Sequence, residues 1–384
     1  MTWLRRARRR AANRKRLFVA ALAGVAGTAA AAQTNDLPPL DIPRVPVLWE
    51  SVFTVRAEAG FKDNVTLAYQ DAPSSAFVSG GVEALVTRLS LDGPQTTFFL
   101  DGDHREYLQG PVGREESASA QAQWKTPVGR RWEISLAGQV QYFDRVMDLS
   151  FTESIRTAVR VRGASFGPRP GLRLNVPGNC WVTLEVPVTR REVDEPVADQ
   201  WETGVRLKLG RDYGHKSEIN VSYEPRYLAY DAANQLAADG TALPNTHRAL
   251  TQHETRLTWR HHWDAARRWR TSIRLGGRVN DDNGSGYFDY TKLFAGLELR
   301  YRTKRWEITA EVTLSRYLYS VQTVSATDLR HRDSMVAGGR LRCERSLGKG
   351  FKLVAEYEHE QVRSNDPFET YAVNTVSSGV NWEF

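Results

Sequence analysis

Three residues near position 100 have the types needed for hydrolytic chemistry. Asp101, Asp103 and His104 stand in the run DGDHRE, and a carboxylate beside an imidazole can activate water. The run also alternates as a β-strand does, which would direct Asp101 and Asp103 to one face and His104 to the other. Strand alternation explains these residues better than a catalytic site does, and we predict that the chain is not an enzyme.

A second run imitates the first half of a calcium-binding loop. Residues 281–286 read DDNGSG, but Lys292 stands where the closing Glu of such a loop is required. No serine is flanked as in a nucleophile elbow, and no glycine-rich loop is present to hold a phosphate. The sequence therefore predicts no metal site and no cofactor.

The charge of the chain is concentrated at its beginning. The 384 residues include 52 Lys plus Arg and 45 Asp plus Glu, but residues 1–32 hold eight of the basic side chains and no acid. The remainder has 44 basic and 45 acidic residues. A nucleic-acid-binding protein needs a basic body, so we expect no nucleic-acid partner. The 10% aromatic content argues against disorder.

The first 32 residues have the features of an export signal. A basic stretch precedes the apolar run Leu17–Ala29, and Ala30 and Ala32 fit a cleavage site before Gln33. A membrane-anchoring helix is the alternative, but the run is short and interrupted by glycine. We predict a signal peptide over residues 1–32 and a proline-rich periplasmic linker over 33–49.

Residues 50–384 alternate between apolar and polar side chains to the end of the chain. Trp306, Ile308 and Ala310, for example, alternate with Glu307 and Thr309, and this period of two indicates strands. We count about sixteen such segments of about ten residues each. Short connections are expected near 93, 127–130, 167–171, 210–214, 264–267, 303–304 and 348–350. Longer ones are expected at 62–75, 109–117, 143–154, 190–199, 228–249, 280–289, 318–333 and 363–370.

Strict alternation of short and long connections is typical of an up-and-down meander with turns at one end and loops at the other. Strands of this length with one apolar and one charged face fit a membrane-spanning barrel, because only closure pairs every strand edge within lipid. The predicted fold is all-β, a closed antiparallel up-and-down transmembrane β-barrel in the outer membrane. A soluble β-sandwich could also alternate, but it would not explain the loop asymmetry.

Cys180 and Cys343 fall in separate strands, and we expect both thiols to be free.

The charged face predicts the residues that line the lumen, and the aromatic residues predict an interfacial girdle. The pore-lining candidates are Arg156, Arg160, Arg162, Arg206, Arg256, Arg260, Arg270, Arg274, Arg278, Arg340, Arg342, Glu311, Glu356, Glu358 and Glu360. The girdle candidates, which lie near the short turns, are Trp124, Trp132, Trp259, Trp263, Trp269, Trp306 and Trp382. Arginine-rich strands facing the glutamates could set a transverse field across a pore, or neighbouring charges could only form salt bridges along the wall.

Two short stretches resemble known outer-membrane proteins. Ser377–Phe384 (SSGVNWEF), closing on Phe384, resembles the signal that barrels present to the outer-membrane assembly machinery. Val55–Val65 (VRAEAGFKDNV) resembles the first strand of a family of outer-membrane β-barrel porins associated with exopolysaccharide. This resemblance implies a barrel and an association with polysaccharide production or export, and it assigns no functional residue.

These observations leave three hypotheses for function. The first is a porin-like channel for small hydrophilic solutes, since sixteen strands enclose a space too wide for side chains to fill. The second is an outer-membrane conduit or accessory barrel for exopolysaccharide export. The third is a non-conducting barrel whose loop surface is adhesive or enzymatic. The expected partners are the lipid bilayer, lipopolysaccharide and the barrel assembly machinery.

Overall fold

The computed structural model describes residues 48–384, apart from 91–92, 152, 154–157 and 326. The predicted signal peptide and most of the predicted linker lie outside the described residues. The first strand begins at Leu48, two residues before the predicted start of the barrel. β1 therefore includes Leu48 and Trp49, which the sequence assigns to the linker.

Eighteen β-strands and one short 3-10 helix, η1 (Pro367–Glu369), form the described structure. The strands are β1 (Leu48–Lys62), β2 (Ser75–Leu89), β3 (Gln95–Tyr107), β4 (Arg114–Val128), β5 (Trp132–Asp148), β6 (Ala158–Val176), β7 (Cys180–Glu185), β8 (Val188–Val193), β9 (Gln200–Gly204), β10 (Arg206–Tyr213), β11 (Ser217–Tyr230), β12 (Ala249–His262), β13 (Trp269–Asp282), β14 (Tyr290–Arg302), β15 (Trp306–Thr323), β16 (His331–Gly348), β17 (Phe351–Ser364) and β18 (Tyr371–Glu383). No helix in the described part of the chain is long and apolar enough to cross a membrane.

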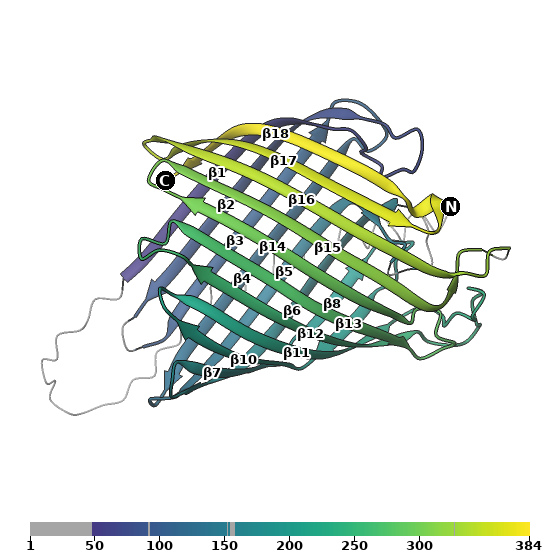
Figure 1. Ribbon diagram of the computed structural model, residues 1–384, viewed down its shortest axis with the longest axis horizontal. Helices are drawn as coiled ribbons and strands as arrows, with labels where there is room; N and C mark the ends of the chain where they lie inside the picture. The colour runs from purple at the N-terminus through teal and green to yellow at the C-terminus, as the bar shows by residue number, and fades with distance from the viewer. Residues whose placement is uncertain (1–47, 91–92, 152, 154–157, 326) are drawn as a thin grey trace, which may run out of the picture. The chain divides into compact units, whose positions relative to one another are not determined.

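The strands form one closed antiparallel barrel. Apart from β7–β10, each strand pairs with the strands before and after it in the chain, and β1 also pairs with β18, from Thr54 opposite Glu383 to Lys62 opposite Thr375. β7 pairs with β6 and β10, whereas β8 pairs with β6 and β9. Figure 1 shows β18 beside β1, with the strands strongly tilted. β7 and β8 are separated only by residues 186–187, and β9 and β10 only by Val205. Counting each of these pairs as one, sixteen wall strands close the barrel, as the sequence predicts.

The alternation in the sequence sets which side chains face outward. Val312, Leu341 and Val55 are 58%, 50% and 42% exposed, and they lie on the outer surface of their strands. Their neighbours Glu311, Arg340 and Arg56 face the interior and form ion pairs there. A continuous apolar outer surface on a closed barrel is stable against lipid and not against water. The barrel is therefore membrane-spanning.

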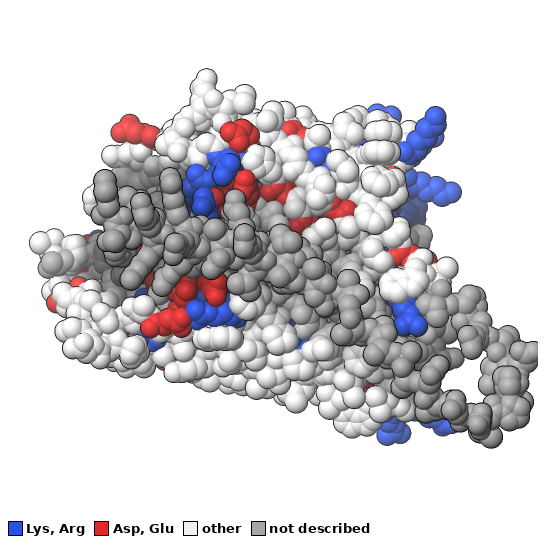
Figure 2. Space-filling model, turned by 180° about the vertical axis from the view of Figure 1, so that it is seen from behind, with Lys and Arg blue, Asp and Glu red and all other residues white. Residues whose placement is uncertain are grey.

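The connections fall into two classes, at opposite ends of the barrel. Short turns of two to six residues join β2–β3, β4–β5, β6–β7, β10–β11, β12–β13, β14–β15 and β16–β17, and the connections at the other end have six to eighteen residues. Lys and Arg side chains project from the end where the short turns lie, at the right of Figure 2. The predicted meander is confirmed.

One predicted turn is wrong. Gly167–Gly171 lies inside β6, and the chain turns instead at residues 177–179. β6 pairs with β8 at residues 163–166 and with β7 at 171–176, so residues 167–170 face the interruption between β7 and β8. Proline has no N–H to donate and is tolerated where a ladder is interrupted. Pro168 and Pro170 therefore mark this gap and not a turn.

Apolar packing inside the barrel is concentrated at the long-loop end. One cluster joins Tyr230, Leu250 and Phe288, and another joins Val362 and Tyr371. Two more lie around Phe77 and around Phe143. The interior is thus packed beneath the loops and lined by charged side chains farther down.

Candidate functional site

Twelve of the fifteen predicted pore-lining residues lie on the inner face of the barrel. They are Arg206, Arg256, Arg260, Arg270, Arg274, Arg278, Arg340, Arg342, Glu311, Glu356, Glu358 and Glu360. The Arg274 and Arg340 side chains are 40% and 44% exposed to the lumen, and that of Glu311 is 28% exposed. Water therefore reaches these charges, which sit on rigid strands.

Two predicted pore-lining residues, Arg160 and Arg162, face outward instead. Both bind the buried carboxylate of Asp144, at 2.6 and 3.0 Å, while Val161 between them packs inward with Phe143. At the long-loop end of β6, charged side chains face outward and apolar side chains face inward. The folded loops fill the interior of the barrel there, and the outer surface lies beyond the apolar part of the wall. The alternation of arginine alone could not reveal this inversion. Arg156 lies outside the described residues.

Four adjacent strands give one side of the lumen an excess of positive charge. We call the inner face of β11–β14 the basic wall, and it has nine Lys or Arg and five Asp or Glu. These residues are Arg226, Arg256, Arg260, Arg270, Arg274, Arg278, Lys292, Arg300 and Arg302, with Glu218, Glu224, Glu254, Asp282 and Glu298.

Glu254 is the hub of the basic wall. Its carboxylate forms ion pairs with Arg226 (3.3 Å), Arg256 (2.6 Å) and Arg278. The Lys292 ammonium lies 4.7 Å from the centroid of the Tyr317 ring. A small cavity of about 180 Å³ is lined by the Glu254 hub together with Arg274, Lys292 and the hydroxyl-bearing Thr313 and Ser315.

The opposite side of the lumen has an excess of negative charge. We call the inner face of β17, β18 and β1–β4 the acidic wall, and it has ten Asp or Glu and five Lys or Arg. These residues are Glu50, Glu58, Glu83, Asp101, Asp103, Glu115, Glu356, Glu358, Glu360 and Glu383, with Arg56, Lys62, Arg105, Lys125 and Lys352. In the circle of sixteen wall strands, β12 and β13 lie eight places from β2 and β3. The two walls therefore face each other and set a transverse field across the lumen.

The predicted salt bridges along the wall are present as well. Arg340 and Arg342 share Glu356 at 2.8 Å each, and Arg274 is paired with Glu311. Pairing between neighbours fixes the side chains without removing the charge difference between the two walls. Both explanations of the charged face thus apply.

A segment of the β5–β6 connection crosses the mouth of the barrel. We call Asp148–Phe151 together with Glu153 the strap. The Phe151 ring stacks on Tyr317 of β15 with centroids 4.6 Å apart, and the Ser150 carbonyl accepts a 2.6 Å hydrogen bond from Arg332 of β16. Since β15 lies eight wall strands from β5, the strap reaches the opposite wall.

Two buried ion pairs hold the strap and its surroundings. Glu153 binds Arg248 at 2.6 Å, and Arg332 binds Glu369 at 2.6 Å with both side chains no more than 1% exposed. Burial raises the pKa of the Glu153 carboxyl above its usual 4.5, although Arg248 opposes the shift. Burial likewise raises the pKa of Glu369 despite Arg332.

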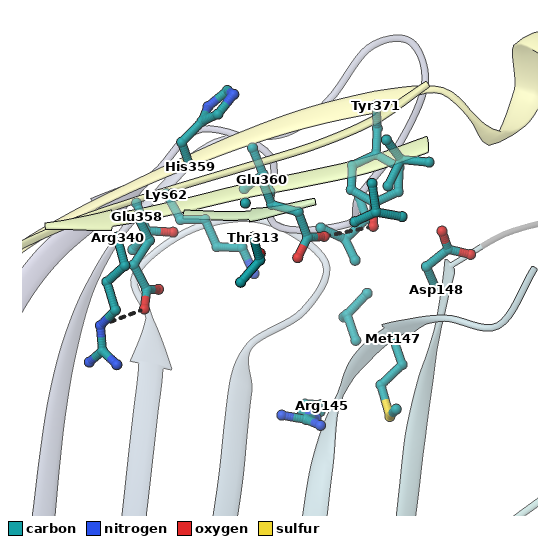
Figure 3. Close-up of a pocket in the computed structure, with 18 of the residues that line it drawn as sticks. Lys62, Arg145, Met147, Asp148, Thr313, Arg340, Glu358, His359, Glu360 and Tyr371 are labelled. Carbon is teal, nitrogen blue, oxygen red and sulfur yellow. Dashed lines mark hydrogen bonds and ion pairs between the residues drawn. The ribbon is translucent and has the colours of Figure 1, made fainter. Parts of the chain in front are cut away.

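A cavity of about 690 Å³ lies beside the strap, bordered by Phe151, by Tyr317 of β15 and by the acidic wall. In Figure 3 Glu360 is hydrogen-bonded to Tyr371, and Arg145 and Met147 face them from the other side. His359, on the same strand as Glu360, points away from this space. The lumen narrows here but retains room for a small molecule.

Several of these residues were not among the sequence candidates. Glu254 lies two residues from Arg256 and Lys292 lies eight residues from Arg300, so each pair shares one face of its strand. The alternation could therefore have identified Glu254 and Lys292 as pore-lining residues. The contacts of Arg332 with Ser150 and Glu369 join segments 182 and 37 residues apart. The sequence contains no local signal for such contacts.

The predicted girdle residues lie toward the short-turn end of the outer surface. Trp124, Trp132, Trp269, Trp306 and Trp382 are 40–51% exposed there, and Trp263 is 62% exposed. Trp259 lies in the same outward row and donates a 2.6 Å hydrogen bond to Tyr213. Phe384 exchanges two backbone hydrogen bonds with Phe53, and the two rings stack. The last residue of the described chain thus joins the seam between β18 and β1.

The other chemically suggestive runs have structural roles. Asp101 binds Arg56 at 2.7 Å, whereas His104 faces outward between Glu106 and Glu116. The Asp282 carboxylate accepts hydrogen bonds from the backbone N–H groups of Gly284, Gly286 and Phe288, and it thereby holds the turn of this loop. Both cysteines are free, as predicted. The described residues contain no cluster of three or more potential metal ligands.

The fold and the lumen define a class of protein, the closed membrane-spanning β-barrel with a charged interior. No family model matches the chain, and no curated protein matches its sequence. The porin-family resemblance at Val55–Val65 thus has no support from these comparisons.

Solved structures resemble this chain at low similarity. They include Acinetobacter baumannii OccAB1 (9% identity, 88% of this chain and 97% of the other, TM-score 0.46) and a BenF-like porin from Pseudomonas fluorescens Pf-5 (8%, 88% and 99%, TM-score 0.45). A bacterial polysaccharide outer-membrane secretin also matches (8%, 87% and 98%, TM-score 0.43). At these scores the likeness does not assign a function.

Proposed function

We propose that this protein is a porin-like channel of an outer membrane that passes small hydrophilic solutes. The observation that carries the proposal is the contrast between the two faces of the barrel wall. Charged side chains that are exposed to water lie on the inner face, and the outer face is apolar. A barrel of sixteen strands is too wide for its side chains to close completely. Passage through the lumen is the function that this arrangement supports best.

The strap and the two charged walls set the properties of the solute. The strap crosses the mouth, and the cavity of about 690 Å³ beside it has room for a small molecule. The facing walls would orient a solute that carries a dipole or separated charges as it passes. We therefore expect transport of small polar molecules and exclusion of long polymers.

Export of exopolysaccharide remains the second proposal, supported by the resemblance of Val55–Val65 to exopolysaccharide-associated porins. A polysaccharide chain would have to pass the strap, which is held by Arg332, Tyr317 and Arg248. This obstruction favours the first proposal over the second.

Solute entry into liposomes that contain the purified protein tests both proposals. The first expects rapid swelling with a disaccharide and none with a polymer of several thousand daltons. Entry of the polymer would favour the polysaccharide conduit. Absence of any entry through a protein shown to be folded would contradict both and favour a barrel that acts through its loops.

A further inference from the structure

The two ends of the barrel differ sharply in charge. Among the described residues, the short turns contain eight Lys or Arg and one acid, Asp264, whereas the long connections contain two Lys or Arg and twelve Asp or Glu. The eight basic residues, all exposed, are Arg130, Arg131, Lys216, Arg267, Arg268, Lys304, Arg305 and Lys349. We call them the basic rim. They occupy five of the seven short turns, so positive charge surrounds this end of the barrel.

A repeated dipeptide links the basic rim to the aromatic girdle. Arg131–Trp132, Arg268–Trp269 and Arg305–Trp306 each join the last residue of a short turn to the first residue of a strand. The three tryptophans face outward and are 44%, 51% and 40% exposed. Tryptophan rings on a membrane protein settle at the depth of the lipid headgroups. Each arginine is thus placed at the edge of the bilayer.

Most of the basic rim is free to bind an anion. Arg268 pairs with Asp264 at 2.8 Å, but within the described residues the side chains of Arg131 and Arg305 have no acidic partner. The guanidinium group matches the geometry of phosphate and can donate two hydrogen bonds to it. An anionic headgroup surface also attracts each nearby Lys or Arg.

We propose that the basic rim binds the phosphate groups of anionic phospholipids in the leaflet at the short-turn end. The repeated tryptophan beside arginine favours lipid over a soluble polyanion, because the outward ring directs this edge of the barrel to the membrane. The acidic long-loop end would not bind such lipids, so the rim would help to fix the depth and direction of the barrel. This role goes beyond solute passage and does not depend on it.

Tryptophan quenching by brominated lipids tests the proposal. The full chain is reconstituted into vesicles of phosphatidylcholine with either brominated phosphatidylcholine or brominated phosphatidylglycerol, and the quenching gives the relative affinity for the two lipids. The test variant is R131Q/R268Q/R305Q. The matched control is R316Q/R330Q/R363Q, which removes three exposed arginines from the long-loop half. A heat-modifiable gel shift verifies that each protein is folded.

We expect the wild type and the control to prefer phosphatidylglycerol roughly fivefold or more, and the test variant to prefer it less than about twofold. High salt should weaken the preference in the wild type. An equal preference in all three proteins, or none in the wild type, would overturn the proposal. If soluble polyglutamate bound the rim while the lipid preference was absent, the rim would be a polyanion site instead. Conductance in a zwitterionic bilayer, measured on the same variants, reports on solute passage separately.

Discussion

At the scale of single residues, Glu254 determines how much positive charge the basic wall presents. One carboxylate serves three arginines, from β11, β12 and β13. Removing this carboxylate would destabilise the barrel. Each arginine would lose a charged hydrogen bond, and its guanidinium group would remain in a partly buried wall without that partner. The selectivity of the lumen and the rigidity of this wall therefore depend on the same side chain.

Replacing Glu254 with Gln should shift ion selectivity toward anions. The substitution removes one negative charge beside Arg226, Arg256 and Arg278, and we expect it to destabilise the barrel by about 2 kcal/mol. The reversal potential in a salt gradient measures the selectivity, and urea unfolding in lipid measures the stability. Glu133→Gln removes a carboxylate from the inner face of β5 and is the matched control. An equal shift of the reversal potential in both variants would show that Glu254 has no special role.

The Glu153 carboxyl predicts how pH acts on the strap. Its pKa is raised when the strap is docked and would return toward 4.5 if the strap were released. The docked strap therefore binds a proton more tightly, so a fall in pH favours docking, and a rise in pH through the raised pKa disfavours it. We expect fewer opening steps in single-channel records at pH 5 than at pH 8.

The matched comparison for the pH effect uses two loop carboxyls. Glu153→Gln removes the titrating group and should reduce the pH dependence, whereas Asp239→Asn changes an exposed carboxyl and should preserve it. More opening steps at pH 5 than at pH 8 in the wild type would contradict the assignment.

At the scale of elements, the strap narrows the mouth of the barrel. Phe151→Ala removes the ring that stacks on Tyr317 and should loosen the strap at the far wall. We expect an increase in mean conductance of about a third or more, because the conductance of a pore depends on the width of its narrowest part. Phe368→Ala, at a phenylalanine that is 76% exposed on another loop, is the control. Unchanged conductance in Phe151→Ala would mean that the strap does not limit passage.

The sequence predicts strands well where one face meets lipid and the other meets water. The period of two in β15, from Trp306 to Leu314, is enough to assign its outward and inward residues. It fails at Arg160 and Arg162, because loops fill the interior there and both faces of β6 change environment. The turn predicted at Gly167–Gly171 is also wrong. Pro168 and Pro170 lie opposite a gap between β7 and β8, where β6 has no strand on that side to which it could donate hydrogen bonds. The strap was not predicted, because its contacts join segments far apart in the chain.

At the scale of the whole molecule, closure depends on the seam between β1 and β18. Phe384 pairs with Phe53 through two backbone hydrogen bonds and a stacked ring. Phe384 thus fastens the closing strand to β1, and we propose that this strand also makes the contact with the barrel assembly machinery.

Replacing Phe384 with Ala should therefore reduce assembly of the barrel in cells severalfold. The loss of the ring weakens the seam and removes the proposed recognition signal, while the strand itself remains. The yield of heat-modifiable barrel in the membrane fraction measures the effect. Phe61→Ala, at another outward-facing phenylalanine on β1, is the control. Equal yields for the two variants would contradict a special role for the terminal residue.

The central claim is that the lumen is an open, charge-lined passage, and single-channel recording tests it most directly. The purified protein is inserted into a zwitterionic planar bilayer, and ion selectivity is compared between the wild type and Arg274→Ala/Arg278→Ala. We predict steady conductance steps in both proteins, with the variant shifted toward cations because two positive charges have left the basic wall. A barrel that is demonstrably folded but gives no conductance would contradict the claim.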